Sequence, residues 1–598
     1  METTTKTKTS LKGGEFLVKE TNCQDVFIPE EFTEEQRMMS QTCKDFVTQE
    51  IWPNLEKIDH QEPGLVPSLL EKAGELGLLG VSIPETYGGL GQNFNTSLLV
   101  TEAMGTSHSF MVAMAAHAGI GTLPILYYGN EAQKKKYLPN LASGKWKASY
   151  CLTEPGSGSD ANSGKTKATL SEDGKYYSIT GQKMWITNAG FADIFVVFAK
   201  IADDKNLTGF IVEKTFGGIT LNEEEKKMGI KGSSTRQVFF NNCKVPAENL
   251  LGEREGGFKI AVNILNIGRA RLGAGAMGAC KEIINKSVQY ANTREQFGMP
   301  ISKFGAIRHK LAEQAIQTFT CESAIYRMGQ NIDDAIESLK AQGKSETEAK
   351  LKGVEQFAIE CAILKVYGSE VLDFCADEGV QIYGGMGFSA DAPMDRSYRD
   401  SRINRIFEGT NEINRLLTVD MVLKRALKGE LDLMGPAKKV AEELLSIPDF
   451  NEDEATTFSE AKTALQNLKK AVLMVAGGAV QKLAAQLQKE QELLMRIADM
   501  MIDIYVAEST LLRVEKLVGI KGEKACALLI DITNTFINEA ADRAYINGKV
   551  ALNHFSEGDE HRMMMMGLKR FTKIKPYDTV ASRRRIAAAV ISENKYCF

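Results

Sequence analysis

The sequence predicts a mainly α-helical protein with a β domain near its middle. Long stretches of the chain place apolar residues three and four positions apart, which is the spacing of a helix with one buried face. From about residue 146 to residue 245, short β-rich runs alternate with turn signals instead. Because the helical and β segments form separate blocks, we expect a barrel or sandwich flanked by helical bundles and not a βαβ fold.

The helical blocks on either side of the β block follow from the apolar period. Before it, residues 33–57, 66–78 and 95–142 fit helices. After it, residues 256–423 fit long helices, interrupted by the polar stretch 334–350 and the glycine-rich loop 384–387. The last block is helical again, with one apolar stripe: Leu465, Leu468, Val472, Val475, Val480, Leu483 and Leu487.

Strands in the middle block are predicted from runs of β-branched and aromatic residues, and Asp173-Gly174 is a hairpin-turn signal. These runs are Tyr176–Thr180, Ile194–Phe198, Gly209–Val212 and Val238–Phe240. A chain of 598 residues is too long for one core, so we expect several domains. The parts are a flexible tail over 1–32, a helical domain over 33–145, a β domain over 146–255, a helical bundle over 256–428 and a C-terminal helical domain over 429–598.

Composition and charge argue against several classes of function. The net charge of −5 disfavours a general nucleic-acid binder. Ten scattered cysteines without a C-x-x-C pair fit a reducing compartment, and six histidines without ligand spacing predict no protein-bound metal. The polar N-terminus resembles neither a signal nor a transit peptide, and the apolar run Ala471–Val480 is too short to span a bilayer. We expect a soluble or at most peripheral protein.

Gly273, Gly275 and Gly278 match the dinucleotide-binding pattern G-x-G-x-x-G. That pattern requires a preceding strand, and here Ala261–Leu272 has a helical pattern. We therefore reject the dinucleotide interpretation and expect these small residues to let two helices pack closely.

Residues 406–415 hold the most informative carboxylate of the chain. Glu408 follows the apolar residues Ile406 and Phe407 and precedes Gly409 and Thr410. Apolar neighbours can desolvate a carboxylate, which raises its pKa and makes it a stronger base. The same residues also fit a capped helix start, and local chemistry alone favours that simpler interpretation.

Three further motifs offer groups that hold a planar or anionic ligand. The glycines and hydroxyls of Tyr150–Ala161 form a loop rich in donors, with a plain turn as the alternative. Lys183–Asn188 contains one of three tryptophans, placed beside hydroxyl and amide groups but equally compatible with a core strand. Arg294–Gly298 combines an arginine, an amide and an aromatic ring, or else simply ends a helix with a solvated arginine.

Two basic clusters have a structural and a functional interpretation. Arg396, Arg399, Arg402 and Arg405 precede Glu408, and a salt-bridged helix face with Asp395 and Asp400 explains most of them. The C-terminal end is basic as well, and a solvated surface is the simpler interpretation; contact with an anionic membrane or with CoA phosphates is the sharper one. Its cations are Lys569, Arg570, Lys573, Lys575, Arg583, Arg584 and Arg585.

In this order and spacing, the motifs of residues 33–423 resemble the acyl-CoA dehydrogenase family. Residues 430–598 make the chain look like the very-long-chain branch, which has an added helical C-terminal domain. The resemblance implies an N-terminal helical domain, a central β barrel or sandwich and a four-helix bundle, with FAD between the β domain and the helices. The motifs are Ile83–Gly91, Tyr150–Ala161, Lys183–Asn188, Arg294–Gly298, Gln381–Phe388 and Ile406–Arg415.

The resemblance also assigns roles to individual residues. It makes Glu408 the catalytic base, and the alternative position used by some relatives is vacant because it holds Gly268. Residues implied to bind FAD within the subunit are Tyr150, Leu152, Thr153, Gly158, Ser159, Trp185, Ile186 and Thr187, with Thr410 and Glu412 near its phosphates and ribose. Those implied to reach the FAD of a second subunit are Arg294, Gln296, Phe297, Gln381, Gly384 and Gly385, and Phe304 is a further implied FAD contact. Implied acyl-CoA contacts are Ser159, Asn266, Arg269, Gly409, Val112 and Ala116.

The implied reaction is α,β-dehydrogenation of an acyl-CoA thioester to the trans-2-enoyl-CoA in fatty acid β-oxidation. Glu408 would remove the α proton, while its backbone N–H and a flavin hydroxyl stabilise charge on the thioester oxygen, an effect of ~3–4 kcal/mol per donor. Small residues around Val112 and Ala116 predict a deep pocket and long-chain substrates. The implied electron acceptor is electron-transfer flavoprotein.

Two other functions remain open within the resemblance, namely an acyl-CoA oxidase that uses oxygen and a flavin-binding assembly or scaffold protein. We expect a homodimer in the cytoplasm, with peripheral contact to the inner face of the membrane through the C-terminal domain as an added interpretation.

Overall fold

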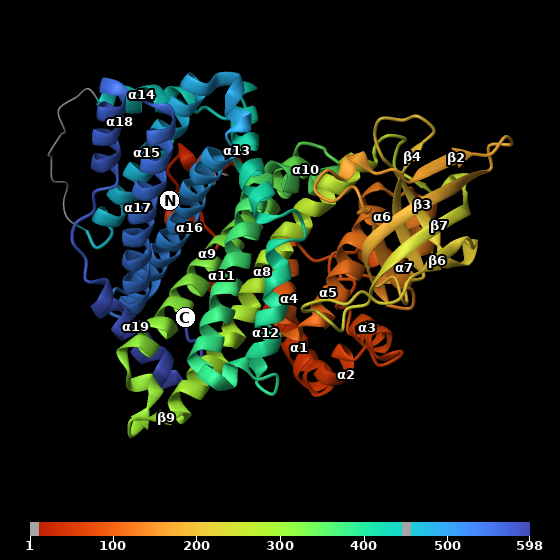
Figure 1. Ribbon diagram of the computed structural model, residues 1–598, viewed down its shortest axis with the longest axis horizontal. Helices are drawn as coiled ribbons and strands as arrows, with labels where there is room; N and C mark the ends of the chain where they lie inside the picture. The colour runs from red at the N-terminus through yellow and green to blue at the C-terminus, as the bar shows by residue number, and fades with distance from the viewer. Residues whose placement is uncertain (1–10, 445–455) are drawn as a thin grey trace, which may run out of the picture.

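The computed structural model describes residues 11–444 and 456–598 and has three regions. The β sheet lies at one end, the C-terminal helices at the other, and three long helices run between them (Figure 1). This is the predicted mainly α fold with a central β domain, in which each block of the sequence forms its own part of the molecule. The three long helices are α8 (Gly257–Thr293), α9 (Gly305–Ala341) and α11 (Ala358–Tyr383).

The N-terminal helical domain consists of shorter helices than the sequence predicted. The expected helix 33–57 breaks into a π turn and a 3₁₀ turn at Val47–Asn54, where Pro53 removes a backbone donor. The expected helix 95–142 is divided by several turns, and its segment Ser109–Tyr128 is apolar and long enough to cross a membrane, yet 72% buried in its most apolar window. The helices are α1 (Glu34–Phe46), α2 (Leu55–Asp59), α3 (Leu65–Glu75), α4 (Phe94–Met104), α5 (Ser109–Ala115), α6 (Leu123–Tyr128) and α7 (Glu131–Ala142), with a π turn at Ala116–Gly121 between α5 and α6.

The β domain is one sheet that folds around its own core. Its strand order is β6-β7-β3-β2-β4-β5-β8, with β1 pairing in parallel to β4. All four predicted strands are present, and the turn at Asp173-Gly174 joins β2 to β3. Inward-facing Phe195, Phe210 and Phe240 fill the core. The strands are β1 (Ala148–Cys151), β2 (Lys167–Leu170), β3 (Tyr176–Thr187), β4 (Ile194–Ile201), β5 (Thr208–Glu213), β6 (Ile219–Leu221), β7 (Thr235–Pro246) and β8 (Leu250–Leu251).

Helix α8 packs closely against α11 and α4 through the glycines of the G-x-G-x-x-G pattern. A Cβ on Gly368 of α11 would lie 3.0 Å from the Cα of Gly273. A Cβ on Gly278 would lie 2.0 Å from the carbonyl oxygen of Glu102 on α4. The pattern therefore lies inside a helix and allows close helix packing, as expected. The polar stretch 334–350 interrupts the bundle less than predicted, because α9 continues to Ala341 and α10 (Glu346–Gln356) follows four residues later.

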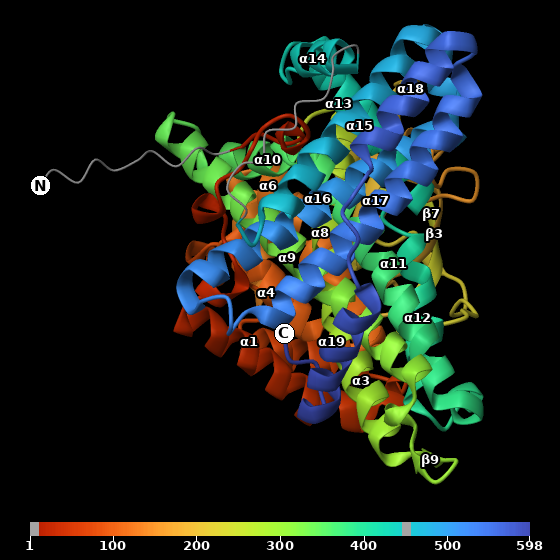
Figure 2. The same cartoon turned by 90° about the vertical axis from the view of Figure 1, so that its left-hand side faces the viewer.

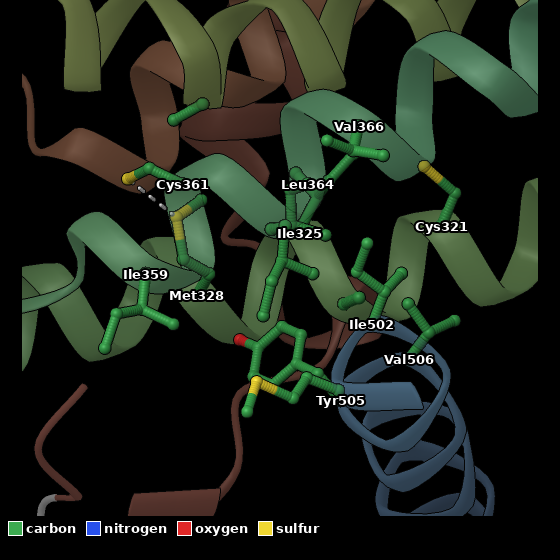
Figure 3. Packing of buried hydrophobic residues seen from close by; sticks show 14 of the residues in the cluster. Cys321, Ile325, Met328, Ile359, Cys361, Leu364, Val366, Ile502, Tyr505 and Val506 are labelled. Atoms are coloured by element: carbon green, nitrogen blue, oxygen red, sulfur yellow. Dashed lines mark hydrogen bonds between the residues drawn. The ribbon is translucent and has the colours of Figure 1, made fainter. Parts of the chain in front are cut away.

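The C-terminal domain lies against the central bundle, and in Figure 2 its helices are in front of the bundle helices. Figure 3 shows Ile502, Tyr505 and Val506 of α16 beside the apolar side chains of α9 and α11. Buried ion pairs join the same surfaces, including Arg327 with Glu508 at 2.8 Å. Helix α13 (Asn411–Leu427) ends the bundle, and the helices of the C-terminal domain are α14 (Met434–Leu444), α15 (Ser459–Leu483), α16 (Gln491–Lys521), α17 (Ala527–Phe555), α18 (Gly558–Phe571) and α19 (Thr579–Glu593).

The prediction of a flexible tail over 1–32 is wrong for residues 11–32, which pack as a strap between the bundle and the C-terminal domain. Phe16 is buried and makes an edge-to-face contact with Tyr505, at 4.9 Å between ring centroids. The backbone N–H of Gly14 donates to Glu360, and Glu30 pairs with Arg513 at 2.7 Å. Polar composition suggested a tail, but its apolar residues are buried against both neighbours: Phe16 contacts Tyr505 of the C-terminal domain and Phe32 contacts Tyr326 of the bundle.

The basic C-terminal end is largely neutralised by carboxylates of the same chain. Arg583 pairs with Glu313 and Glu539, and Arg585 pairs with Asp531 at 2.7 Å. Salt bridges of this kind leave less free positive charge on the surface than the sequence suggested. The membrane interpretation, which depended on that charge, loses much of its basis.

Phe16→Ala tests whether the strap is part of the folded core. Loss of a buried phenylalanine is expected to lower the free energy of unfolding by about 3–5 kcal/mol, measured by chemical denaturation. Met38→Ala, at a side chain that is 65% exposed on α1, is the control and should change it by less than about 0.5 kcal/mol. Equal stability of the two variants would contradict a packed strap.

Candidate active site

Glu408 lies in a tight turn between the 3₁₀ helix Arg402–Arg405 and α13. Its φ of 59° and the φ of 82° at Gly409 are both in the left-handed region, which is unfavourable for a glutamate. The turn is fixed through its carbonyl oxygens. Arg269 donates to the carbonyl of Glu408 at 3.1 Å, and Lys365 donates to the carbonyl of Gly409 at 2.7 Å.

Asn414 holds the same turn from the first turn of α13. Its side-chain amide donates to the carbonyl oxygens of Glu408, Gly409 and Thr410, with the shortest distance, 2.8 Å, to Gly409. Within the described residues, the backbone N–H of Glu408 has no hydrogen-bond partner. The turn therefore holds the Glu408 side chain in one direction and leaves one backbone donor open to a ligand.

The carboxyl group of Glu408 is desolvated. Its Oε2 is inaccessible to solvent and has no hydrogen-bond partner in residues 11–444 and 456–598. Burial raises the pKa of Glu408 to about 7, although the positive charges of Arg269 and Lys365 oppose this shift. A carboxyl with this pKa exchanges a proton near neutral pH, as a general base requires.

The neighbouring position on α8 must be small. A Cβ on Gly268 would lie 2.8 Å from Oε2 of Glu408. Gly268, the position at which some relatives are expected to have their catalytic glutamate, thus lies next to the carboxyl of Glu408. A glutamate at residue 268 would compete for this point, so Glu408 alone supplies a carboxylate here.

The simpler interpretation of residues 406–415 as a helix cap holds for Thr410 and not for Glu408. The hydroxyl of Thr410 accepts the backbone N–H of Ile413 at 3.2 Å and caps α13. Glu412 is exposed in the first turn of α13, where a carboxylate suits the helix dipole. Because a neighbour makes the cap, the carboxyl of Glu408 is available for chemistry.

A long cavity begins at Glu408 and follows α8. It has a volume of about 210 Å³ for the centres of water-sized molecules. Val112 and Ala116 line it, as the sequence predicted, and the small residues Ala118 and Gly119 lie on the same wall. Further along α8 the wall continues over Ala279 to its polar end. Much of the apolar segment 109–128 therefore serves to line this cavity.

One of the β-domain residues assigned to a flavin lines the cavity, and the others lie on the same strand or on β1 and the loop after it. Thr187 lines the cavity. Trp185, two residues before it, lies at a bulge of β3 with a φ of 60°, and its side chain is 51% exposed. Tyr150 is buried with an unpartnered hydroxyl, and Leu152 is buried beside it. The loop after β1 continues over Thr153, Gly158 and Ser159, of which the last two are exposed, while Ile186 is buried in the strand.

These residues fit the FAD that the resemblance implies. An exposed indole on a bulged strand offers a flat face, and an orphaned buried hydroxyl needs a partner that the protein does not supply. Nothing lies within 4 Å of a Cβ built on Gly158, so the loop is open to a ligand.

The acyl-CoA residues predicted on α8 lie beside the turn that carries Glu408. Asn266 is buried and accepts a hydrogen bond from Arg269 at 2.9 Å. Arg269 is fixed by this bond and by its bond to the carbonyl of Glu408. The pair thus helps to position the turn that carries the base.

A second group of predicted FAD residues lies on the outer surface. Phe297 is 91% exposed on the hairpin of β9 (Glu295–Gln296) and β10 (Met299–Pro300), and Phe304 contacts it edge-to-face at 5.9 Å. None of these residues lines the cavity that holds Glu408. The exposed members of the group are Arg294, Gln296, Phe297, Gln381, Gly384 and Gly385.

Arg396, Arg399 and Arg405 form ion pairs before Glu408, and one of the three has a predicted partner. Arg399 pairs with Asp395 at 2.7 Å as expected. Arg396 instead pairs with Asp59 at 2.7 Å, and Asp400 contacts His108 at 3.1 Å. These bonds connect α12 (Pro393–Ser401) to the N-terminal domain.

Lys365 and Asn414 are site residues that the motifs did not reveal. Burial lowers the pKa of Lys365 to about 7, and the charge of Glu408 acts against this shift. A lysine within the otherwise apolar run Ala362–Val366 is the sequence signal that could have identified it. Asn414 has no comparable signal, because an asparagine early in a helix is commonplace.

Four family profiles match this chain, and each is described as an acyl-CoA dehydrogenase domain. The N-terminal domain matches residues 33–145, the middle domain 149–243 and the C-terminal domain 255–423. Another profile, also described as a C-terminal domain, matches residues 467–570.

Relatives and solved structures are similar over most of the chain. A probable acyl-CoA dehydrogenase of Bacillus subtilis (strain 168) is 44% identical over 585 residues, which is 98% of each chain. A mitochondrial very long-chain specific acyl-CoA dehydrogenase of Rattus norvegicus is 40% identical over 77% of this chain and 71% of that protein. The crystal structure of an acyl-CoA dehydrogenase complexed with FAD from Bacillus anthracis is 45% identical, with a TM-score of 0.95 over 98% of this chain and 100% of that one.

Glu408→Gln tests the desolvation of the carboxyl through stability. The folded-state pKa lies above the unfolded value, so stability is highest below the unfolded pKa and falls as pH rises through about 7. At pH 8 the free energy of unfolding of the glutamine variant is expected to exceed that of the wild type by up to about 3 kcal/mol. At pH 4.5 the two free energies should differ little.

Chemical denaturation at the two pH values measures this difference. Glu412→Gln, in the exposed first turn of α13, is the matched control and should show no gain at pH 8. A gain of the same size in both variants would argue against a desolvated Glu408.

Proposed function

Because the chain belongs to the acyl-CoA dehydrogenase family and is an FAD-dependent enzyme, we propose that it oxidises long-chain acyl-CoA thioesters to trans-2-enoyl-CoA in fatty acid β-oxidation. One observation carries the proposal. The unpartnered carboxyl of Glu408 lies at the start of a long cavity, where Gly268 leaves room beside it. This geometry supplies a base of suitable pKa and a space for an acyl chain.

Two groups of Glu408 have different roles in the proposed reaction. The carboxylate of Glu408 accepts the α proton of the thioester, and burial makes it a stronger base than an exposed carboxylate. Its own backbone N–H, which has no partner among the described residues, can donate to the thioester oxygen as negative charge develops there. FAD, when bound, supplies the acceptor for the β hydrogen.

Arg269 and Lys365 affect both the pKa and the position of Glu408. Their charges limit the rise in the pKa of Glu408, so the carboxyl is still ionised in part near neutral pH. Both side chains also bond to the carbonyls of the turn, which prevents the base from rotating away. A bound acyl chain would exclude water and strengthen all of these interactions.

The length of the cavity supports long-chain substrates. Residues that line it extend along α8 from Gly268 to Lys286, about 27 Å at the rise of an α-helix. An extended chain advances roughly 1.2 Å per bond, so this distance corresponds to about 20 bonds. The similarity to the very long-chain specific enzyme of Rattus norvegicus supports the same class of substrate.

We further propose that a second subunit completes the FAD site and that the enzyme is a homodimer. The exposed hairpin with Phe297 and the exposed Gln381, Gly384 and Gly385 support this, because they are implied FAD contacts that lie away from the cavity. The ten free cysteines support a reducing, cytoplasmic location.

For reoxidation we propose electron-transfer flavoprotein as the acceptor. Oxygen consumption by the reduced enzyme without an added acceptor would favour the oxidase alternative. Glu408 and its desolvated environment favour an enzyme over a protein with only an assembly role, because a scaffold has no need of a base.

Anaerobic titration with acyl-CoAs tests the reaction. The flavin absorbance of the purified enzyme should bleach on addition of palmitoyl-CoA, and Glu408→Gln should bind the same ligand without bleaching. Loss of the base is expected to slow flavin reduction by at least about 100-fold. A glutamine variant that reduces its flavin at the normal rate would rule out Glu408 as the base.

Ala116→Phe tests the path of the acyl chain. A phenyl ring at this wall position should lower kcat/KM for palmitoyl-CoA at least about tenfold more than for butyryl-CoA. Ala279→Phe, further along the same cavity, should affect only the longest chains. If both variants reduced activity equally at every length, the chain would not follow this cavity.

A further inference from the structure

His108 lines the cavity and has a strained backbone. It joins the short 3₁₀ helix Gly105–Ser107 to α5. Its φ of 52° and ψ of −125° lie in a region that favours glycine over residues with a side chain. A strained backbone persists only where neighbouring contacts hold it, and such residues concentrate at functional sites. The imidazole of His108 is therefore held at the cavity at a cost in conformational energy.

Asp400 fixes the imidazole of His108 through one of its two nitrogens. Nδ1 lies 3.1 Å from Oδ2 of Asp400, and the other carboxylate oxygen accepts the backbone N–H of Ile230. A carboxylate can only accept a hydrogen bond, so Nδ1 carries a proton and this bond sets the orientation of the ring. Within the described residues Nε2 forms no hydrogen bond, so a ring that lines the cavity keeps one polar atom without a protein partner.

Neighbouring polar side chains on this wall of the cavity are engaged with the protein. The amide of Asn404 donates to the carbonyl oxygens of Asp400 and Ser401. The hydroxyl of Ser401 donates to the carbonyl oxygen of Tyr398. These bonds hold the wall together, whereas Nε2 of His108 has no such structural use.

His108 lies deeper along the cavity than Glu408. A Cβ on Gly105 would lie 2.2 Å from the carbonyl oxygen of Gly275, and a Cβ on Gly275 would lie 1.8 Å from the terminal methyl carbon of Met111. The segment 105–111 therefore packs at the level of Gly275, which follows Gly268 by seven residues on α8. At the rise of an α-helix this is about 10 Å from the carboxyl of Glu408, or about nine bonds of an extended acyl chain beyond the α carbon.

A hydroxyl group on the acyl chain matches Nε2 in either protonation state of the imidazole. A neutral ring with its proton on Nδ1 accepts at Nε2, a protonated ring donates there, and a hydroxyl can do both. An unsubstituted chain that fills the cavity excludes water and leaves Nε2 unpaired, which is unfavourable. The fixed ring of His108 is thus suited to a chain that carries an alcohol about nine bonds beyond the α carbon.

We propose that His108 binds a hydroxyl group in the middle of the acyl chain, so that CoA thioesters of mid-chain hydroxy fatty acids are substrates. This inference rests on the proposed function, because Glu408 acts on the thioester end of the same molecule. His108 then selects among substrates and takes no part in proton removal.

Substrates that differ by one oxygen atom test the inference on the holoenzyme. The hydroxylated chains are 10- and 12-hydroxyoctadecanoyl-CoA, and the reference is octadecanoyl-CoA. In the wild type, at least one hydroxylated chain should give a kcat/KM similar to or above that of the reference. His108→Leu should lower kcat/KM for that chain about 10- to 100-fold and leave octadecanoyl-CoA unchanged or improved.

Three controls locate the effect at the imidazole. The hydroxyl of 6-hydroxyoctadecanoyl-CoA lies short of His108, so this chain should respond to His108→Leu as octadecanoyl-CoA does. His108→Gln places an amide near the position of Nε2 and should restore part of the preference. Met111→Leu alters the same wall without adding or removing a polar group, and it should change hydroxylated and unsubstituted chains by the same factor.

Binding without turnover separates recognition from a structural role. In the Glu408→Gln holoenzyme, the Kd of each ligand is read from the change in flavin absorbance. Adding His108→Leu should raise the Kd of the preferred hydroxylated chain about 10- to 100-fold and leave that of octadecanoyl-CoA unchanged. A lowered melting temperature with equal loss for both chains would show that His108 only bonds α12 to the N-terminal domain, and would overturn the inference.

The outcomes distinguish this inference from the proposed function. If the wild type bleaches with octadecanoyl-CoA but disfavours both hydroxylated chains by more than about tenfold, or if His108→Leu changes all chains alike, the inference is wrong and the proposed function stands. If the wild type bleaches with no acyl-CoA of either kind, the proposed function fails and the inference fails with it.

Discussion

The close packing of α8 against α4 and α11 is the constraint on which the rest of the site depends. Gly273 and Gly278 bring backbones so near that any side chain would clash, and this fixes α8 relative to both neighbours. The same helix provides Gly268, which leaves space beside the base, and Arg269, which holds the turn of the base. Helix α8 therefore forms one wall of the cavity and at the same time positions the turn that carries Glu408.

The electrostatics of Glu408 follow from this arrangement. Burial raises its pKa, and two cations on two different helices, Arg269 on α8 and Lys365 on α11, limit the rise. Because both cations also hold carbonyls of the turn, the same side chains influence the position of Glu408 and its pKa. The left-handed backbone of Glu408 is the strained element of the site, and Asn414 helps to hold it.

The sequence predicted the block structure of the fold, because helical and β periods differ and are easily distinguished in long segments. It also identified Glu408 and the vacancy at Gly268, which the structure brings to the same point. It could not predict the strap of residues 11–32, since that segment is polar and only tertiary contact buries Phe16. Nor could it show that Arg583 and Arg585 are paired with carboxylates on other elements, because such pairing depends on residues distant in sequence.

The most direct measurement of the central claim is the protonation state of Glu408 itself. Infrared difference spectra between the wild type and Glu408→Gln, recorded over a pH series, isolate the stretching band of one protonated carboxyl. The band should disappear as pH rises, with a midpoint at a pH of about 7. A midpoint near 4.5, the ordinary value for a glutamate, would contradict a desolvated base and with it the account of the site.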